Sequence, residues 1–285
     1  MCPVVNTKDP AAVEAEVQAT HQAIFPSADK SFVSKAFFWT INCFSGKYRN
    51  YLPIDARYHD LEHTLQVTLC MTRLLHGWHL ARAQPVLTER LFQLSLLAIL
   101  FHDTGYLKTR DDTEGTGAKY TLVHVTRSTE FAATLLRENG FSETDILAVQ
   151  NMIRCTGVNV KLDAVPFQAE EERFLGYSLG TADLLGQMAA EDYVEKLPIL
   201  FEEFAESDKF NVDNPTPRMV FSSAQDLMEK TPGFWNFYVL PRITNDFRGL
   251  YKYLSQPFPD GPNWYVEKIE QNLIRVKEVT AANVV

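Results

Sequence analysis

Apolar residues recur at intervals of three and four along nearly every long segment of the chain, which places them on one face of a helix. No segment shows the alternation of a half-buried strand, and no repeat or low-complexity tract interrupts the pattern. The pattern therefore predicts an all-α protein. The expected helices cover residues 9–25, 27–46, 60–79, 85–105, 122–140 and 142–157, with one or two long helices over 169–207.

Residues that favour helix ends stand at several of these boundaries. Asp9 followed by Pro10 is the pattern of an N-cap and a first-turn proline. Asp60 is placed to cap the segment that follows it, and Ser142 with Asp145 matches a capping box. Several segments close on a glycine, which readily ends a helix.

The segment 85–105 is expected to open on Pro85, and it becomes apolar nearly all round toward its end. A helix that is apolar on every side is buried. Its last turn carries His102 and Asp103 side by side into that interior. Burial of an unpartnered carboxylate is costly, and a divalent cation removes this cost, as would a salt bridge to an arginine.

Two further segments also place polar side chains where they need a partner. In "YHDLEHTLQV", His59 and His63 have the spacing that puts two side chains on one face of a helix, where they could point into one pocket. In "LGTADLLG", Asp183 lies among small and apolar residues that would allow another helix to approach closely. This carboxylate also needs a cation, unless it caps a helix or forms a salt bridge.

We therefore expect a divalent-metal site with two imidazoles and two carboxylates. The four ligands would be His63, His102, Asp103 and Asp183. Mixed His/Asp ligation suits several metals, including Mn, Fe and Zn, and does not select one. Such a site activates water and neutralises phosphoryl oxygens, with His59 free to serve as an acid.

The composition and charge of the chain exclude some classes of function. With 285 residues, 46% hydrophobic residues and a net charge of -9, the chain lacks the positive field of a protein that coats nucleic acid. The start of the chain lacks the pattern of a secretory signal, and the apolar runs are too short to cross a bilayer. A cytoplasmic, soluble protein is expected. Four scattered cysteines are expected to be small buried residues: Cys2, Cys43, Cys70 and Cys155.

The stretches "YHDLEHTLQV", "LAILFHDTGY" and "LGTADLLG", in this order, resemble the motifs of HD-domain metal-dependent phosphohydrolases. Within that superfamily they are most similar to the catalytic domain of class I cyclic-nucleotide phosphodiesterases. The resemblance implies a helical bundle around a metal site, in which Asp103 can also bridge to a second metal. It implies the same four ligands and makes His59 the acid that protonates the leaving oxygen.

Two more residues are assigned to the substrate. His124 lies where many HD proteins have a histidine near the second metal or the phosphate, although a structural role is equally expected. Tyr58 opens the first motif. Cys155 and Thr156 stand where a further histidine of binuclear HD sites would be expected, and Asp60 replaces the asparagine of phosphodiesterases. Cyclic-nucleotide specificity does not follow from the motifs.

The expected function is hydrolysis of a small phosphoester, such as a nucleotide or cyclic nucleotide, with one or two divalent ions such as Mn, Mg, Fe or Zn. Asp60 and Glu62 are expected to support a charged His59 if their side chains reach it. Two alternatives remain open. One is an HD-type di-iron oxygenase, and the other is a non-catalytic sensor that binds metal or nucleotide without turnover.

The motifs suggest three parts of one fold. Residues 1–45 would be N-terminal helices packed on the core, residues 46–190 the HD core, and residues 191–285 a C-terminal helical extension. The stretch 211–218 is a predicted break. The aromatic-rich last third could close over the pocket or form a homodimer surface, although ordinary core helices are the simpler expectation.

Overall fold

The computed structural model describes residues 5–211 and 221–282, and it is 68% helical with almost no strands, which confirms the all-α prediction. The α-helices are α1 (Pro10–Ile24), α2 (Ser31–Phe44), α3 (Leu61–Leu80), α4 (Glu89–Phe101), α5 (His124–Glu138), α6 (Glu143–Arg154), α7 (Glu170–Met188), α8 (Tyr193–Phe210), α9 (Ala224–Phe234) and α10 (Trp264–Ala282). Short helical turns connect them: η1 (Thr104–Tyr106), η2 (Gly117–Tyr120), η3 (Leu162–Ala164), η4 (Trp235–Val239), η5 (Arg242–Asp246) and η6 (Leu250–Leu254).

The three predicted N-caps are confirmed. Asp9 accepts a hydrogen bond from the backbone of Ala11, and Asp60 accepts one from the backbone of His63 at 2.8 Å. Ser142 accepts one from the backbone of Asp145 at 3.2 Å. Each bond satisfies a backbone N–H that the first turn of a helix leaves without a partner.

The start of the central helix differs from the prediction. Helix α4 begins at Glu89, four residues after Pro85, because the Thr88 hydroxyl accepts a hydrogen bond from the backbone of Leu91 and caps the helix there. Its last residue is Phe101, so His102 occupies the C-cap. The imidazole and the following carboxylate therefore lie just beyond the helix end.

The placement of His59 on the same helix as His63 is wrong. Asp60 has an extended backbone, with φ -96° and ψ -174°, and its side chain caps α3. A residue before the N-cap lies outside the helix, so His59 belongs to the preceding loop. The two imidazole rings are still neighbours, with ring centroids 5.4 Å apart.

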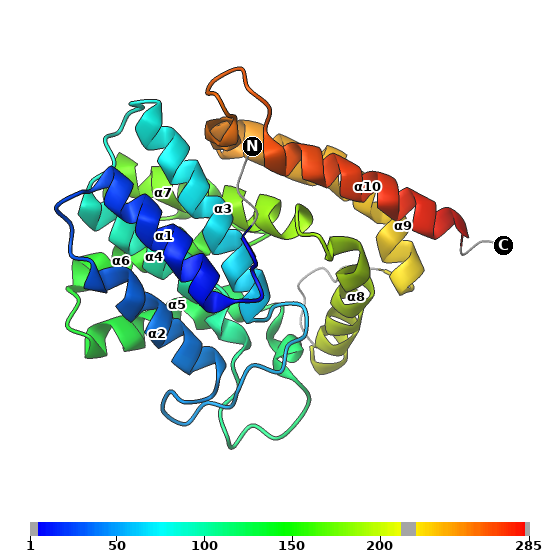
Figure 1. The fold of residues 1–285 in the computed structure, drawn as a ribbon. Helices are drawn as coiled ribbons and strands as arrows, with labels where there is room; N and C mark the ends of the chain where they lie inside the picture. The colour runs from blue at the N-terminus through cyan, green and yellow to red at the C-terminus, as the bar shows by residue number, and fades with distance from the viewer. Residues whose placement is uncertain (1–4, 212–220, 283–285) are drawn as a thin grey trace.

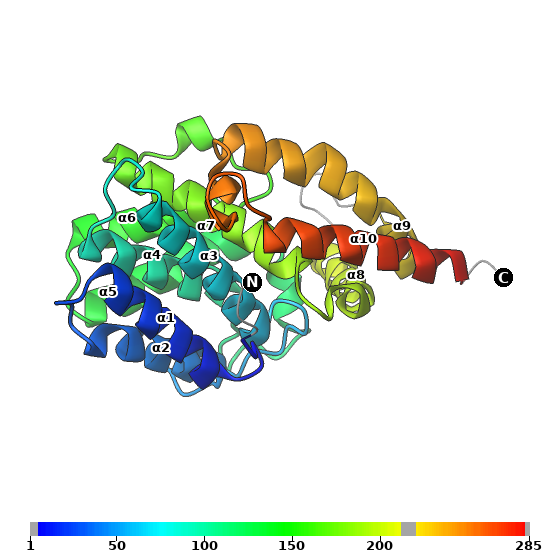
Figure 2. The same ribbon diagram turned by 45° about the horizontal axis from the view of Figure 1, so that its top comes forward.

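Helices α1 to α7 form the main bundle, and α8, α9 and α10 lie together on the side away from α2 (Figures 1 and 2). Helix α7 packs closely against α3, as the small residues near Asp183 predicted. A Cβ atom on Gly186 would lie only 2.8 Å from the Cα of Val67. This close approach brings the C-terminal part of α7 next to the first turns of α3.

One hydrophobic cluster extends through the bundle from Val13 to Val276 and therefore includes residues of all three predicted parts. The end of α4, including Leu97 and Phe101, is fully buried within it. The division at residues 45 and 190 stays a prediction. Among the described residues, no helix has both the length and the apolar character needed to cross a membrane.

The cysteine prediction is confirmed for the described residues. Cys43, Cys70 and Cys155 are buried, and Cys2 lies outside the described residues. Residues 212–218 of the predicted break also lie outside them.

Candidate metal centre

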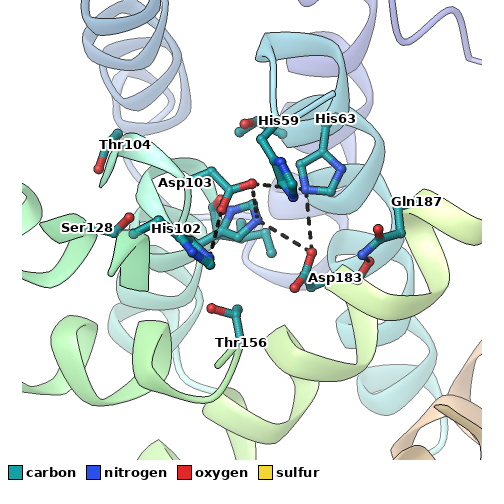
Figure 3. A network of polar contacts seen from close by, with 12 residues as sticks. His59, His63, His102, Asp103, Thr104, Ser128, Thr156, Asp183 and Gln187 are labelled. Carbon is teal, nitrogen blue, oxygen red and sulfur yellow. Dashed lines mark hydrogen bonds and ion pairs between the residues drawn. The ribbon is translucent and has the colours of Figure 1, made fainter. Parts of the chain in front are cut away.

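Four predicted ligands meet at one buried point, although they come from three helices (Figure 3). The Nε2 atoms of His63 and His102 lie 3.1 and 3.2 Å from Oδ2 of Asp103. Oδ1 of Asp183, from the middle of α7, lies 3.5 Å from each of the same two nitrogens. Two imidazoles and two carboxylates thus face one another, and His59 lies beside them (Figure 3).

The atoms at the centre of this cluster lack hydrogen-bond partners. Nε2 of His63, Nε2 of His102 and Oδ2 of Asp103 are buried, and none makes a hydrogen bond of acceptable geometry within the described residues. Possible ligand atoms of these three residues lie within 4.8 Å of one another. Buried polar atoms rarely remain unpaired, so a cation bound by all three fits this observation.

The backbone fixes which nitrogen of His102 faces the cluster. Its Nδ1 lies 2.7 Å from the carbonyl oxygen of Ile99, which can only accept a hydrogen bond. Nδ1 therefore carries a proton, and Nε2 is the atom that a cation at the centre would meet. Hydrogen bonds of this kind orient histidine ligands in metal sites.

The cluster strongly perturbs its own ionisation. Burial alone would lower the pKa of His63, but Asp103 and Asp183 outweigh it and raise this pKa to about 9. Burial alone would raise the pKa of Asp183, but His102 and His63 outweigh it and lower this pKa to about 2. Without a cation, the carboxylates therefore hold protons on the histidines. A bound divalent ion would take the place of those protons.

His59 is fixed by a carboxylate that comes from a distant helix. Oε2 of Glu203, on α8, lies 2.6 Å from Nδ1 of His59, and Oε1 accepts a hydrogen bond from the backbone N–H of Tyr58 at 2.7 Å. Glu203 is only 4% exposed. Burial would raise the pKa of Glu203, but His59 and the backbone hydrogen bonds outweigh it and lower this pKa.

The expected support of His59 by its sequence neighbours is not what the structure shows. Asp60 caps α3, and Glu62 pairs with Lys196 at 3.2 Å. Both carboxylates are held by these other partners. Glu203 provides the carboxylate contact to His59 instead.

His124 is brought to the cluster as well. Its Nε2 lies 3.8 Å from Oδ1 of Asp103, while its Nδ1 donates to the carbonyl oxygen of Thr121 at 2.6 Å. Asp103 thus faces His63 and His102 with one oxygen and His124 with the other. The ring of Tyr106 stacks on the ring of His59 and also on that of His124, at centroid distances of 4.5 and 4.7 Å, and the two imidazole centroids are 6.2 Å apart.

Tyr58 does not line the cavity beside the cluster, so a direct substrate contact is not supported. Its side chain is buried, and its hydroxyl donates to Oε1 of Gln187 at 2.9 Å. Nε2 of Gln187 in turn donates to the backbone carbonyl of Asp183 at 3.0 Å. Tyr58 therefore braces the part of α7 that carries Asp183.

A cavity of about 540 Å³ opens beside the cluster. His59, Asp103, His124 and Asp183 line one part of it. Residues of α8, α9, η4 and η5 line another part, so segments of the last third do lie over the predicted pocket. Pockets of this size commonly hold small molecules.

Few features of the sequence point to Glu203. It follows Glu202 in "LFEEFAES", and helical spacing places it three residues after Leu200, on the side of α8 that faces inward. That position marks it as an unusual buried glutamate. Nothing in the sequence indicates that its partner lies in the loop before α3.

The fold and the cluster define an all-α protein with a buried His/Asp centre. Residues 34–278 match the model of the Npun_R2479-like family, and the chain therefore belongs to this family. The match includes every residue of the cluster, as well as Glu203 and the helices beside the cavity. No curated protein matches the chain.

Proposed function

We propose that this protein is a metal-dependent phosphohydrolase that cleaves a phosphoester. The observation that carries the proposal is that possible metal ligands and a separate possible acid lie beside the same cavity. Four side chains with ligand chemistry converge on one point, and a separate imidazole, His59, has its own carboxylate partner beside them. The resemblance of three motifs to HD-domain phosphohydrolases supports the same chemistry.

His63, His102, Asp103 and Asp183 would hold the cation. A bound divalent ion supplies a water of lowered pKa and charge to offset the phosphoryl oxygens. The unpartnered nitrogens of His63 and His102 are the donors that such an ion requires. Asp103 and Asp183 line the cavity together with His59, so an ion held by the four residues would place the phosphorus next to His59.

His59 would protonate the departing oxygen. Its Nδ1 is engaged by Glu203, so Nε2, on the other edge of the ring, is the atom available to the cavity. The carboxylate of Glu203 fixes the ring orientation and offsets the charge that a protonated His59 carries. After the ester bond breaks, the proton of Nε2 resides on the leaving alcohol.

His124 would act on the metal side of the reaction rather than as a phosphate donor. Burial lowers the pKa of His124, which favours the neutral ring. Because its Nδ1–H donates to Thr121, its Nε2 presents a lone pair. A lone pair suits a second cation bridged by Asp103, whereas a phosphoryl oxygen needs a donor.

Metal content and turnover together test the proposal. Elemental analysis of the purified protein should find one or two divalent ions per chain, and these should be lost in Asp103→Asn and retained in the exposed control Asp163→Asn. Bis(4-nitrophenyl) phosphate and 4-nitrophenyl phosphate serve as substrates with added Mn, Mg, Zn or Fe. His59→Ala should keep the metal and lose about 100-fold or more in kcat.

Three outcomes would contradict the proposal in different ways. Failure to bind any of the four ions would remove the metal site itself. Metal binding without turnover of any ester would favour the sensor. Coloured protein with two irons and oxygen consumption would favour the di-iron oxygenase.

A further inference from the structure

The cavity beside the cluster is far more apolar than the cluster itself. Leu197, Leu200 and Phe204 of α8 line it, and so do Leu227 and Phe234 of α9. Phosphoryl chemistry requires no such wall. The wall therefore bears on the part of the substrate that does not react.

The wall on the C-terminal side is one face of a continuous helical segment. Helix α9 runs on through the π-helical turns η4 and η5, and its cavity-lining residues recur at helical spacing as Leu227, Thr231, Phe234, Tyr238 and Arg242. The rings of Phe234 and Tyr238 are stacked, with centroids 5.1 Å apart. Helical turns of the π type often occur at functional sites.

The cations in the wall are already paired. Lys230 lies 2.8 Å from Asp226, and Arg242 lies 2.9 Å from Asp246, each one turn along the same segment. These carboxylates offset the positive charges that a second or third phosphate would need. The wall is therefore poorly suited to a polyphosphate and well suited to an uncharged apolar group.

We propose that the substrate is an ester with a single phosphoryl group joined to a large apolar group, and that the wall of α8, α9 and η4 binds this group. The inference rests on the proposed function and adds its substrate class. The phosphoryl group would lie beside Asp103 and Asp183, and the apolar group would extend toward Leu200, Leu227 and Phe234.

A homologous series of substrates tests this directly. Methyl, butyl and octyl 4-nitrophenyl phosphodiesters share one leaving group, so their intrinsic reactivities are similar. With metal-loaded protein, kcat/KM should rise about fourfold for each methylene that becomes fully buried, until the cavity is filled. Substrate concentrations are kept below those at which the octyl ester forms micelles.

Two variants of the segment formed by α9 and η4 test whether the cavity wall causes the dependence of kcat/KM on chain length. Phe234 lines the cavity, whereas Phe237, in the next turn, is 85% exposed and does not. Phe234→Ala should lower kcat/KM for the octyl ester by tenfold or more and leave the methyl ester nearly unchanged. The matched control Phe237→Ala should alter neither.

Binding of unreactive phosphonates separates this inference from the proposed function. Octylphosphonate should bind metal-loaded protein at least tenfold more tightly than methylphosphonate by calorimetry, and Phe234→Ala should reduce the difference. Hydrolysis with no dependence on chain length would overturn the inference and leave the function standing. Chain-length-dependent binding without hydrolysis of any ester would overturn the proposed function and leave only the binding of an apolar group by the wall. Neither binding preference nor hydrolysis would overturn both.

Discussion

Glu203 lies 2.6 Å from Nδ1 of His59, although 144 positions separate the two residues in the chain. The contact joins α8 to the loop before α3, and a second hydrogen bond, donated by the backbone N–H of Tyr58 to Glu203, strengthens it. The ring of His59 therefore takes its orientation from the C-terminal third of the protein. In the proposed reaction Glu203 would be a positioning residue, since it does not line the cavity itself.

Glu203→Gln should keep an acceptor for the Tyr58 backbone and remove the negative charge beside His59. We expect kcat to fall by about 10- to 100-fold with metal content unchanged, because partners that orient a working histidine have effects of this size. The pH profile of kcat should also change shape. The adjacent Glu202→Gln is the control, since Glu202 pairs with Arg57 at the surface and should leave both readouts unaltered.

Metal binding should release protons. Asp103 and Asp183 outweigh burial and raise the pKa of His63 to about 9, and the pKa of His102 is raised for the same reasons. These rings are protonated in the metal-free protein at pH 7.5 and must lose their protons to bind a cation. Apparent affinity should therefore increase as the pH rises from 7 toward 9. Calorimetry in buffers of different ionisation enthalpy measures the release, and buffer-independent heats would contradict it.

His124→Gln should separate one metal position from two. Its Nε2 faces only the outer oxygen of Asp103, so the four-ligand cluster does not depend on it. If two ions bind to the wild type, the variant should retain one of them at similar affinity. His79→Gln, a substitution at the far end of α3, is the control and should retain both. Loss of all metal in His124→Gln would place this residue within the primary site.

Gly105→Ala should disturb the cluster through the backbone. A Cβ atom there would collide with the carbonyl oxygen of His124, and the Gly105 N–H donates to Ser128 at 2.8 Å. We expect a loss of about 2–4 kcal/mol in unfolding free energy and weaker metal binding. Gly233→Ala is the matched control, because the nearest atom to its new Cβ would lie 3.9 Å away. It should be neutral or stabilising by up to about 1 kcal/mol in urea unfolding.

The parts of the fold that local chemistry determines could be predicted from sequence. Asp9, Asp60 and Ser142 begin helices where predicted, because a short side chain caps the first turn without any distant partner. The prediction of the start of α4 at Pro85 is wrong, because both Pro85 and Thr88 favour a helix start and only tertiary context selects between them. The spacing predicts His59 on α3, but the Asp60 cap excludes it from that helix.

The candidate site also has residues that could be predicted from the sequence and residues that could not. Four residues could be predicted as ligands because they lie in apolar sequence surroundings, and burial of such groups requires a partner: His63, His102, Asp103 and Asp183. Glu203 could not be paired with its partner, because the contact between α8 and the loop before α3 depends on how the whole bundle packs. The cavity wall formed by α9 and η4 depends on the same packing.

The four proposed ligands come from the first turn of α3, the end of α4 and the middle of α7. An ion bound by all of them would act as a cross-link that closes two long loops of the chain, much as a disulfide does. Such a closure restricts the unfolded chain most when the loops are long. Removal of the ion would therefore lower the free energy of unfolding, and the proposed metal centre would hold together three helices that are far apart in the sequence.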